Sequence, residues 1–128
     1  MLAWGKRVSK LFRDRVQQIG VSLGVDPNFL MACMAFESGR TFSPSIENAA
    51  GSGAVGLIQF MPGTAQALGT TTSKLKGMSA VEQLDFVEKY FKPRAGKLKT
   101  LEDVYMTILW PAAIGKPSSY VLFDRFRC

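Results

Sequence analysis

One carboxylate, Glu37, is placed where a side chain could transfer a proton. It follows an apolar run of eight residues, Phe29 to Phe36, and a segment rich in Gly and Ser comes after it. A carboxyl at the border of a buried core loses hydration, which raises its pKa and keeps it protonated near neutral pH, as a general acid requires. The alternative is a helix-end Glu whose side chain bends out into solvent. Position alone leaves both interpretations open.

The other nine carboxylates have structural explanations. They are expected on the polar faces of helices, in caps and first turns where the helix dipole favours negative charge, or in exposed segments. These residues are Asp14, Asp26, Glu47, Glu82, Asp85, Glu88, Glu102, Asp103 and Asp124. Of these, Glu47 is the only carboxylate in the loop that follows Glu37, and a solvated loop position is the simpler interpretation.

The absence of histidine excludes several kinds of active site. The chain has no His and two cysteines, Cys33 and Cys128. A Ser-His-Asp triad, a Cys-His pair and a four-thiolate zinc site are therefore impossible. Chemistry based on carboxylate, Lys, Tyr, Ser or Cys remains, and we expect no metal and no cofactor.

A second segment, Ser52 to Ala65, is suited to contact a ligand. Its small residues allow the backbone to approach a ligand closely, and Gln59 offers both a donor and an acceptor. Pro62 is typical of the first turn of a helix. The segment predicts a tight turn leading into a short helix.

Helical periodicity and capping residues dominate the rest of the chain. The expected elements are a helix over about 6–20, a helix that begins at Asp26-Pro27 and carries the apolar run, a loop over 41–56 with at most a short ribbon, a helix from Pro62 to about Leu68, a helix from the Ser79/Glu82 capping box to Pro93, a helix from Thr100 to Trp110 and a short helix from Pro117. The prediction is a mainly α single domain over 1–128, with five to six helices around a buried central helix and little or no sheet.

The charge favours anionic partners. The formal net charge is +6 and the sequence pI is about 9.6, which suits nucleic acid, phospholipid or bacterial wall without choosing among them. No nucleic-acid reader motif is found, so nucleic acid is the weakest candidate. The helix over 6–20 could meet a membrane, but packing within the domain is the favoured interpretation. The N-terminus lacks the pattern of a signal peptide, so we expect delivery by another route if the protein acts outside the cytoplasm.

Glu37 and the second segment together resemble a known family. Glu37-Ser38 and the later run Gly53-Ala54-Val55-Gly56-Leu57-Ile58-Gln59-Phe60-Met61-Pro62-Gly63-Thr64-Ala65 resemble the soluble-lytic-transglycosylase-like (goose-type lysozyme-like) family. The family pattern is Glu-Ser, a variable stretch, and Gly-Ala-x-Gly-Leu-Met-Gln-x-Met-Pro-x-Thr-Ala. Tyr120-Val121 looks like its later Tyr-Val pair, and Leu109 to Lys116 resembles phage-encoded wall-degrading domains.

The resemblance implies a lysozyme-like fold and a reaction. The family cleaves the β-1,4 bond between N-acetylmuramic acid and N-acetylglucosamine in peptidoglycan without a metal or cofactor. Glu37 would be the general acid and base, with assistance from Tyr120 or Glu47. The implied substrate-binding residues are Ser52, Gly53, Ala54, Gln59, Met61 and Trp110.

Three interpretations of the function follow from this resemblance. The single well-placed acid favours lytic transglycosylation, the first alternative is a hydrolytic muramidase with Glu47 as second carboxylate, and the second is a catalytically silent wall-binding module. The expected partner is the glycan strand, bound by a monomer. The expected site of action is the periplasm or the cell wall, reached by a phage-encoded enzyme or a specialised export route.

The chain departs from the family pattern at several places. The stretch from Glu37 to Gln59 is longer than in the common pattern, so the loop between them is expected to be enlarged. Ala50 stands where many relatives have a serine, and Asn48 or Ser52 is the candidate replacement. Trp110-Pro111-Ala112-Ala113 replaces a Tyr-Asn-Ala-Gly element. Trp110 could stack on a sugar ring or belong to the core.

Overall fold

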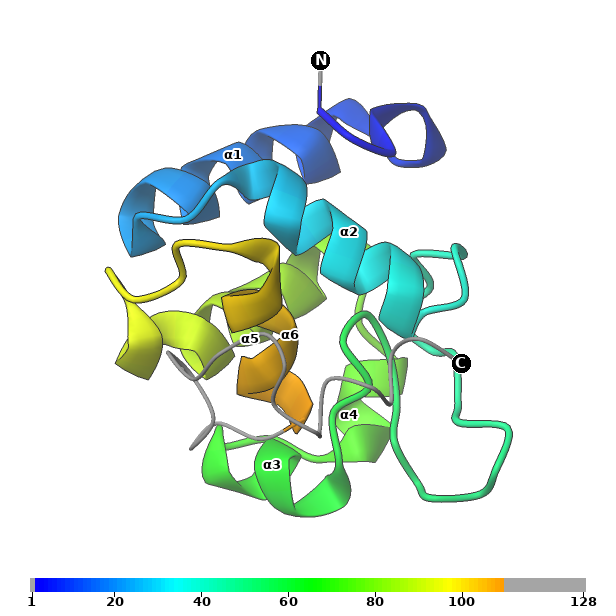
Figure 1. Ribbon diagram of the computed structural model, residues 1–128. Helices are drawn as coiled ribbons and strands as arrows, with labels where there is room; N and C mark the ends of the chain where they lie inside the picture. Colours follow the sequence, from blue (N-terminus) through cyan, green and yellow to red (C-terminus); the bar gives the residue numbers. More distant parts are fainter. Residues whose placement is uncertain (1, 110–128) are drawn as a thin grey trace.

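The computed structural model describes residues 2–109 as a helical domain (Figure 1). Its helices are α1 (Lys10–Leu23), α2 (Pro27–Glu37), α3 (Pro62–Ala67), α4 (Thr72–Lys76), α5 (Ala80–Phe91) and α6 (Leu101–Leu109), with short 3-10 helices η1 (Gly5–Arg7) and η2 (Lys92–Arg94). Within this part of the chain, extended pairing is limited to isolated bridges at Val55. The predicted mainly α class is confirmed.

Three predicted helix starts are confirmed because each depends on a local side-chain cap. Asp26 accepts a hydrogen bond from the Asn28 backbone N–H at 2.9 Å, and Pro27 follows in the first turn. Ser79 and Glu82 form the reciprocal capping box. The Thr100 hydroxyl likewise accepts from the Asp103 N–H at 3.1 Å. Caps of this kind satisfy backbone donors that the first helical turn leaves unpaired.

The helix expected over 6–20 is shifted toward the C-terminus. Ser9 caps α1 by accepting from the Phe12 N–H at 3.1 Å, and the helix continues past Gly20 to Leu23. Gly20 is small for a packing reason, because a Cβ there would lie 2.8 Å from the Val25 carbonyl oxygen. Gly20 therefore allows close packing of the next segment instead of ending the helix, and Gly24, with φ of 67°, ends it.

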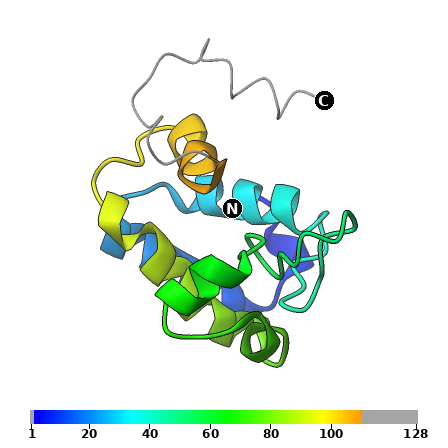
Figure 2. The same cartoon turned by 90° about the horizontal axis from the view of Figure 1, so that it is seen from below.

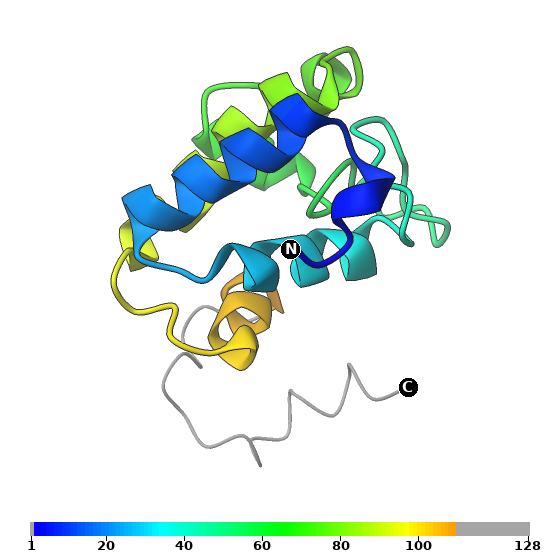
Figure 3. The ribbon, with the colours of Figure 1, turned by 90° about the horizontal axis from the view of Figure 1, so that it is seen from above.

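The expectation that α2 is buried all round is correct for most of its length and wrong at its end. Five of its apolar residues are buried, namely Leu30, Met31, Cys33, Met34 and Ala35. Phe36 is 51% exposed. The helix packs against α1 and α6, between which it lies in Figure 3, and its last turn emerges from this core.

The loop expected over 41–56 folds beside the C-terminal end of α2 (Figure 2). It is followed by α3, which begins at Pro62 as predicted, and by α4, which the sequence analysis did not predict. The α4 helix has five residues and a Thr71 cap, too short for an apolar period to mark it. The loop, α3 and α4 thus gather at the end of the helix that carries Glu37.

Candidate active site

Glu37 is the last residue of α2 and its carboxyl is largely withdrawn from water. Burial raises the pKa of this carboxyl from 4.5 to about 7. Within residues 2–109, no other carboxylate contributes to this shift and no hydrogen-bond partner of the Glu37 side chain is found. A carboxyl with this pKa is protonated in a large fraction of molecules at neutral pH and can also act as a base.

Ser38 fixes the turn that follows Glu37. Its hydroxyl is fully buried, donates to the Met34 carbonyl oxygen at 2.6 Å and accepts from the Phe42 N–H at 2.9 Å. Phe42 in turn packs edge-on against Phe12, with ring centroids 6.0 Å apart. The second residue of the Glu-Ser motif therefore holds the chain where it leaves the helix, and this orients the neighbouring acid.

Gln59 lies in a tight turn closed by two backbone hydrogen bonds between Val55 and Phe60, at 2.8 and 3.0 Å. Gln59 itself has φ of 57°, a left-handed conformation that is uncommon for a non-glycine residue. Its side-chain amide donates to the carbonyl oxygens of Gly56 at 3.0 Å and Ile46 at 3.3 Å. The amide oxygen is thereby oriented and remains the part of the side chain able to accept a hydrogen bond from a ligand.

Gln83 supports this turn through hydrogen bonds of its side chain. The sequence alone did not predict this role. The buried Gln83 side chain accepts from the Leu57 N–H at 2.8 Å and donates to the carbonyl oxygens of Pro44 at 2.9 Å and Leu75 at 3.0 Å. Gly56, with φ of 87°, is required here because a Cβ would overlap the Gln83 amide. The available signal was a polar residue on the apolar side of the helix that carries Leu84 and Val87.

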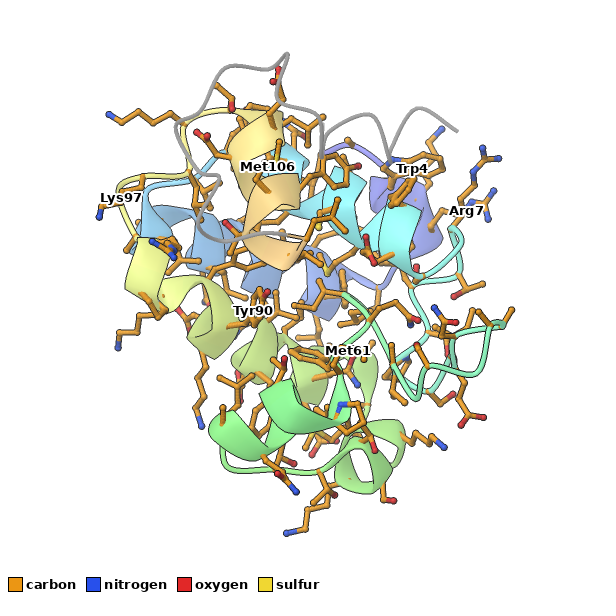
Figure 4. All side chains as sticks on the ribbon, turned by 60° about the horizontal axis from the view of Figure 1, so that its bottom comes forward. Trp4, Arg7, Met61, Tyr90, Lys97 and Met106 are labelled. Atoms are coloured by element: carbon orange, nitrogen blue, oxygen red, sulfur yellow. The ribbon has the colours of Figure 1, made fainter. Side chains whose placement is uncertain are left out.

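A pocket lies between this turn and helices α3, α5 and α6. Its lining comes from the loop, α3, α5 and α6: Ile58, Gln59, Phe60, Met61, Thr64, Tyr90 and Ile108. The pKa of Tyr90 is raised to about 12, mainly by burial and further by the negative charges of Cys33 and Glu37. Tyr90 therefore lies within electrostatic range of Glu37 while it lines the same pocket as Gln59 and Met61. In Figure 4, Met61 and Tyr90 lie on the side of α2 away from Trp4.

The other predicted site residues are distributed more widely. Ser52 and Gly53 are exposed, whereas the Ala54 side chain is buried in the loop interior. Glu47 is 64% exposed and forms an ion pair with the Lys76 ammonium. Trp110 and Tyr120 lie outside the described residues. The residues between Glu37 and Gln59 form a loop that packs on Gln83.

Several carboxylates expected to be structural have structural partners. Asp85 and Glu88 both bind the Arg15 guanidinium, at 3.0 and 2.7 Å, and so connect α5 to α1. In the described part of the chain, no group of three or more His, Cys, Asp or Glu residues could hold a metal ion. No single helix there is long and apolar enough to cross a membrane. Helices α1 and α2 reach the required length and hydropathy only when they are taken together, and the chain bends by 120° between them.

The sequence matches an established family model. The model of the transglycosylase SLT domain matches residues 14–107, a range that includes Glu37, Gln59, Gln83 and Tyr90. No curated protein and no solved structure matches the chain significantly. Since the matched range spans most of the chain and contains Glu37 and the turn of Gln59, the chain belongs to the transglycosylase SLT domain family.

Proposed function

We propose that this protein cleaves the β-1,4 bond between N-acetylmuramic acid and N-acetylglucosamine in peptidoglycan by lytic transglycosylation. Membership of the family supports a peptidoglycan-cleaving transglycosylase activity in general terms. The observation that carries the proposal is the half-buried carboxyl of Glu37, whose pKa burial raises to about 7. The substrate implies action in the periplasm or at the cell wall.

The proposed reaction uses Glu37 twice. Its protonated carboxyl first donates a proton to the glycosidic oxygen, and the bond between that oxygen and the muramyl C1 breaks as oxocarbenium character develops. The resulting carboxylate then accepts the proton of the muramyl C6 hydroxyl, whose oxygen bonds to C1 and closes a 1,6-anhydro ring. A pKa near 7 makes both protonation states accessible at neutral pH. Gln59 and Met61 would contact the sugar from their pocket.

Hydrolysis with Glu47 as a second carboxylate is the alternative. A second carboxylate in a glycosidase lies within about 10 Å of the acid and faces the same sugar. Glu47 is mostly exposed and forms an ion pair with Lys76. Among the residues that the structure describes, no carboxylate charge contributes to the raised pKa of Glu37. These observations favour the single-carboxylate reaction.

Digestion of purified Gram-negative peptidoglycan, followed by mass spectrometry of the muropeptides, tests the proposal. We expect products that end in 1,6-anhydro sugar. Glu37→Gln cannot supply the proton and should lower the rate by about 10²–10⁴-fold, whereas Glu47→Gln should keep most of the activity. Thermal melting checks that both variants fold.

Each other outcome identifies a different function. Free reducing ends together with an inactive, folded Glu47→Gln variant would establish a two-carboxylate hydrolase. Normal activity of a folded Glu37→Gln variant would refute the mechanism. Absence of any glycan cleavage, with binding to the wall retained, would identify a wall-binding module.

A further inference from the structure

A second pocket lies against α2, close to Glu37 but separate from the pocket of Gln59. Its volume is about 250 Å³, and it is lined by Trp4, Ala32, Ala35, Phe36, Arg40 and Tyr105. Within residues 2–109, the two pockets share no lining residue. In Figure 4, Trp4 lies on one side of α2 and Met61 lies on the other. Glu37 is the last residue of the helix that separates these two pockets.

Apolar surface dominates the second pocket. Phe36 is 51% exposed and Trp4 is 38% exposed, which makes them two of the five large apolar side chains exposed in the described part of the chain. Phe36 also packs edge-on against Tyr105, with ring centroids 5.6 Å apart. Aromatic rings beside two alanines form a shallow apolar surface that suits small aliphatic groups and sugar faces.

Among the described residues that line this pocket, Arg40 carries the only charged side chain. Its guanidinium lies over the Trp4 ring, 6.0 Å from the ring centroid. Among the described residues, no carboxylate forms an ion pair with Arg40. A guanidinium can bind a carboxylate through two parallel hydrogen bonds.

Both residues of this stacked pair have an uncommon backbone conformation. Trp4 has φ of 61° and Arg40 has φ of 69°. Each is held by hydrogen bonds, because the Arg40 N–H donates to the Ala35 carbonyl oxygen at 2.7 Å and the Trp4 carbonyl oxygen accepts from Arg7 at 3.0 Å. Strained residues that the surrounding structure maintains are concentrated at functional sites. Two such residues meet at this pocket.

The pocket is also close to the candidate acid. Phe36 and Arg40 lie one residue before and three residues after Glu37 in the chain. The pKa of Tyr105 is raised to about 12, mainly by burial, with contributions from the charges of Cys33 and Glu37. A group bound in this pocket would therefore lie close to the glycosidic bond that Glu37 is proposed to protonate.

We propose that this pocket binds the peptide carried by the muramyl residue, with Arg40 paired to a peptide carboxylate and Trp4 and Phe36 against its alanyl methyl groups. The proposal rests on the proposed function, because it takes peptidoglycan as the substrate. Peptidoglycan peptides combine small aliphatic side chains with free carboxylates, and the pocket combines apolar rings with one guanidinium. The enzyme would accordingly prefer strands that retain their peptides.

Binding of a soluble muramyl peptide tests this pocket without requiring catalysis, because this probe has no glycosidic bond to cleave. Titration calorimetry would compare the muramyl peptide with the same compound whose carboxyls are amidated. We expect the wild-type protein to bind the free acid at least about tenfold more tightly, since hydrogen bonds between charged groups are the strong ones. Arg40→Gln should abolish this preference, and Arg40→Lys should restore part of it.

The matched control is Arg7→Gln, which removes the same charge from an exposed neighbouring position in η1. It should keep the preference for the free acid. Thermal melting should show that the exposed Arg40 can be replaced without unfolding. Equal affinity of the wild-type protein for both compounds, or equal losses in the two glutamine variants, would overturn the proposal.

Cleavage assays separate this proposal from the proposed function. Glycan strands with peptides and the same strands stripped by an amidase would be digested by the wild-type protein and by Arg40→Gln. We expect Arg40→Gln to raise KM about tenfold on peptide-bearing strands and to change the rate on stripped strands less than twofold. Failure to cleave either substrate, with carboxylate-dependent binding intact, would refute the proposed function and leave the pocket assignment standing.

Discussion

At the scale of single residues, the chemistry of Glu37 depends on its hydration. Burial of its carboxyl group is the cause that raises its pKa to about 7. Glu82 shows the opposite effect in the same chain, because hydrogen bonds from the backbone and side chain of Ser79 lower its pKa. Two carboxylates at the two ends of helices thus differ in protonation because one is dehydrated and the other is hydrogen-bonded.

This contrast predicts a pH-dependent gain of stability in Glu37→Gln. The folded protein binds this proton more tightly than the unfolded chain, whose Glu pKa is near 4.5. The stability that the folded protein gains from binding this proton is fully present below pH 4.5, and it is lost as the pH rises to about 7. Removing the carboxyl should therefore raise the free energy of unfolding at pH 8, by on the order of 1–2 kcal/mol after allowance for partial exposure, and change it little at pH 4.

Urea denaturation at the two pH values measures this effect. The control is Glu82→Gln, which should lose stability at pH 8 because its lowered pKa stabilises the folded state above the unfolded pKa. An unchanged stability of Glu37→Gln at pH 8 would mean that the Glu37 carboxylate is well solvated, and its assignment as the acid would lose its physical basis.

At the scale of elements, the loop that carries Gln59 depends on one buried amide. Gln83 extends from α5 and forms hydrogen bonds to three backbone groups, in Pro44, Leu57 and Leu75. These groups belong to the loop, to its turn and to α4. The turn of Gln59 is thus held by contacts between distant segments as well as by its own backbone hydrogen bonds.

Gln83→Ala should destabilise the fold by about 2–4 kcal/mol, because it leaves buried backbone groups unpaired. The matched control is Gln66→Ala on exposed α3, which should change stability by less than about 0.5 kcal/mol. Urea denaturation measures both values, and peptidoglycan cleavage by Gln83→Ala should fall further than its folded fraction predicts. Equal stabilities of the two variants would show that other contacts hold the loop.

At the scale of the whole molecule, the positive charge should assist binding to the anionic wall. The net charge is +6, and cations are spread along α1, α4, α5 and the segment after α5. Attraction of this kind is screened by salt, since the Debye length falls from about 10 Å at 0.1 M to about 3 Å at 1 M. The effect acts on association and leaves the chemistry at Glu37 unchanged.

Sedimentation of Glu37→Gln with purified peptidoglycan measures this association without turnover. Bound protein should decrease severalfold between 0.05 and 0.5 M salt, over which screening becomes strong. Binding to a neutral chitin oligosaccharide is the control and should change little. Salt-independent binding to the wall would show that charge does not contribute to recognition.

The sequence by itself determined the features that depend on neighbouring residues. The caps at Asp26 and Ser79 could be predicted because each connects residues two or three positions apart. The position of Glu37 after an apolar helix allowed either a dehydrated or a solvated carboxyl. The five-residue α4 is too short for an apolar period to mark it. The C-terminal end of α1 could not be predicted, because Gly20 serves close packing of the next segment and does not end the helix.

Only the tertiary structure decided how far Glu37 is buried, what holds Gln59 and where a second pocket forms. Gln83 contacts residues up to 39 positions away, and the pocket at Arg40 combines segments that include Trp4 and Tyr105. Such contacts leave little periodicity or spacing in the sequence, because each requires two distant segments to be packed first. The residue types that can perform the chemistry are therefore visible in the sequence, whereas their hydration and mutual placement arise from packing.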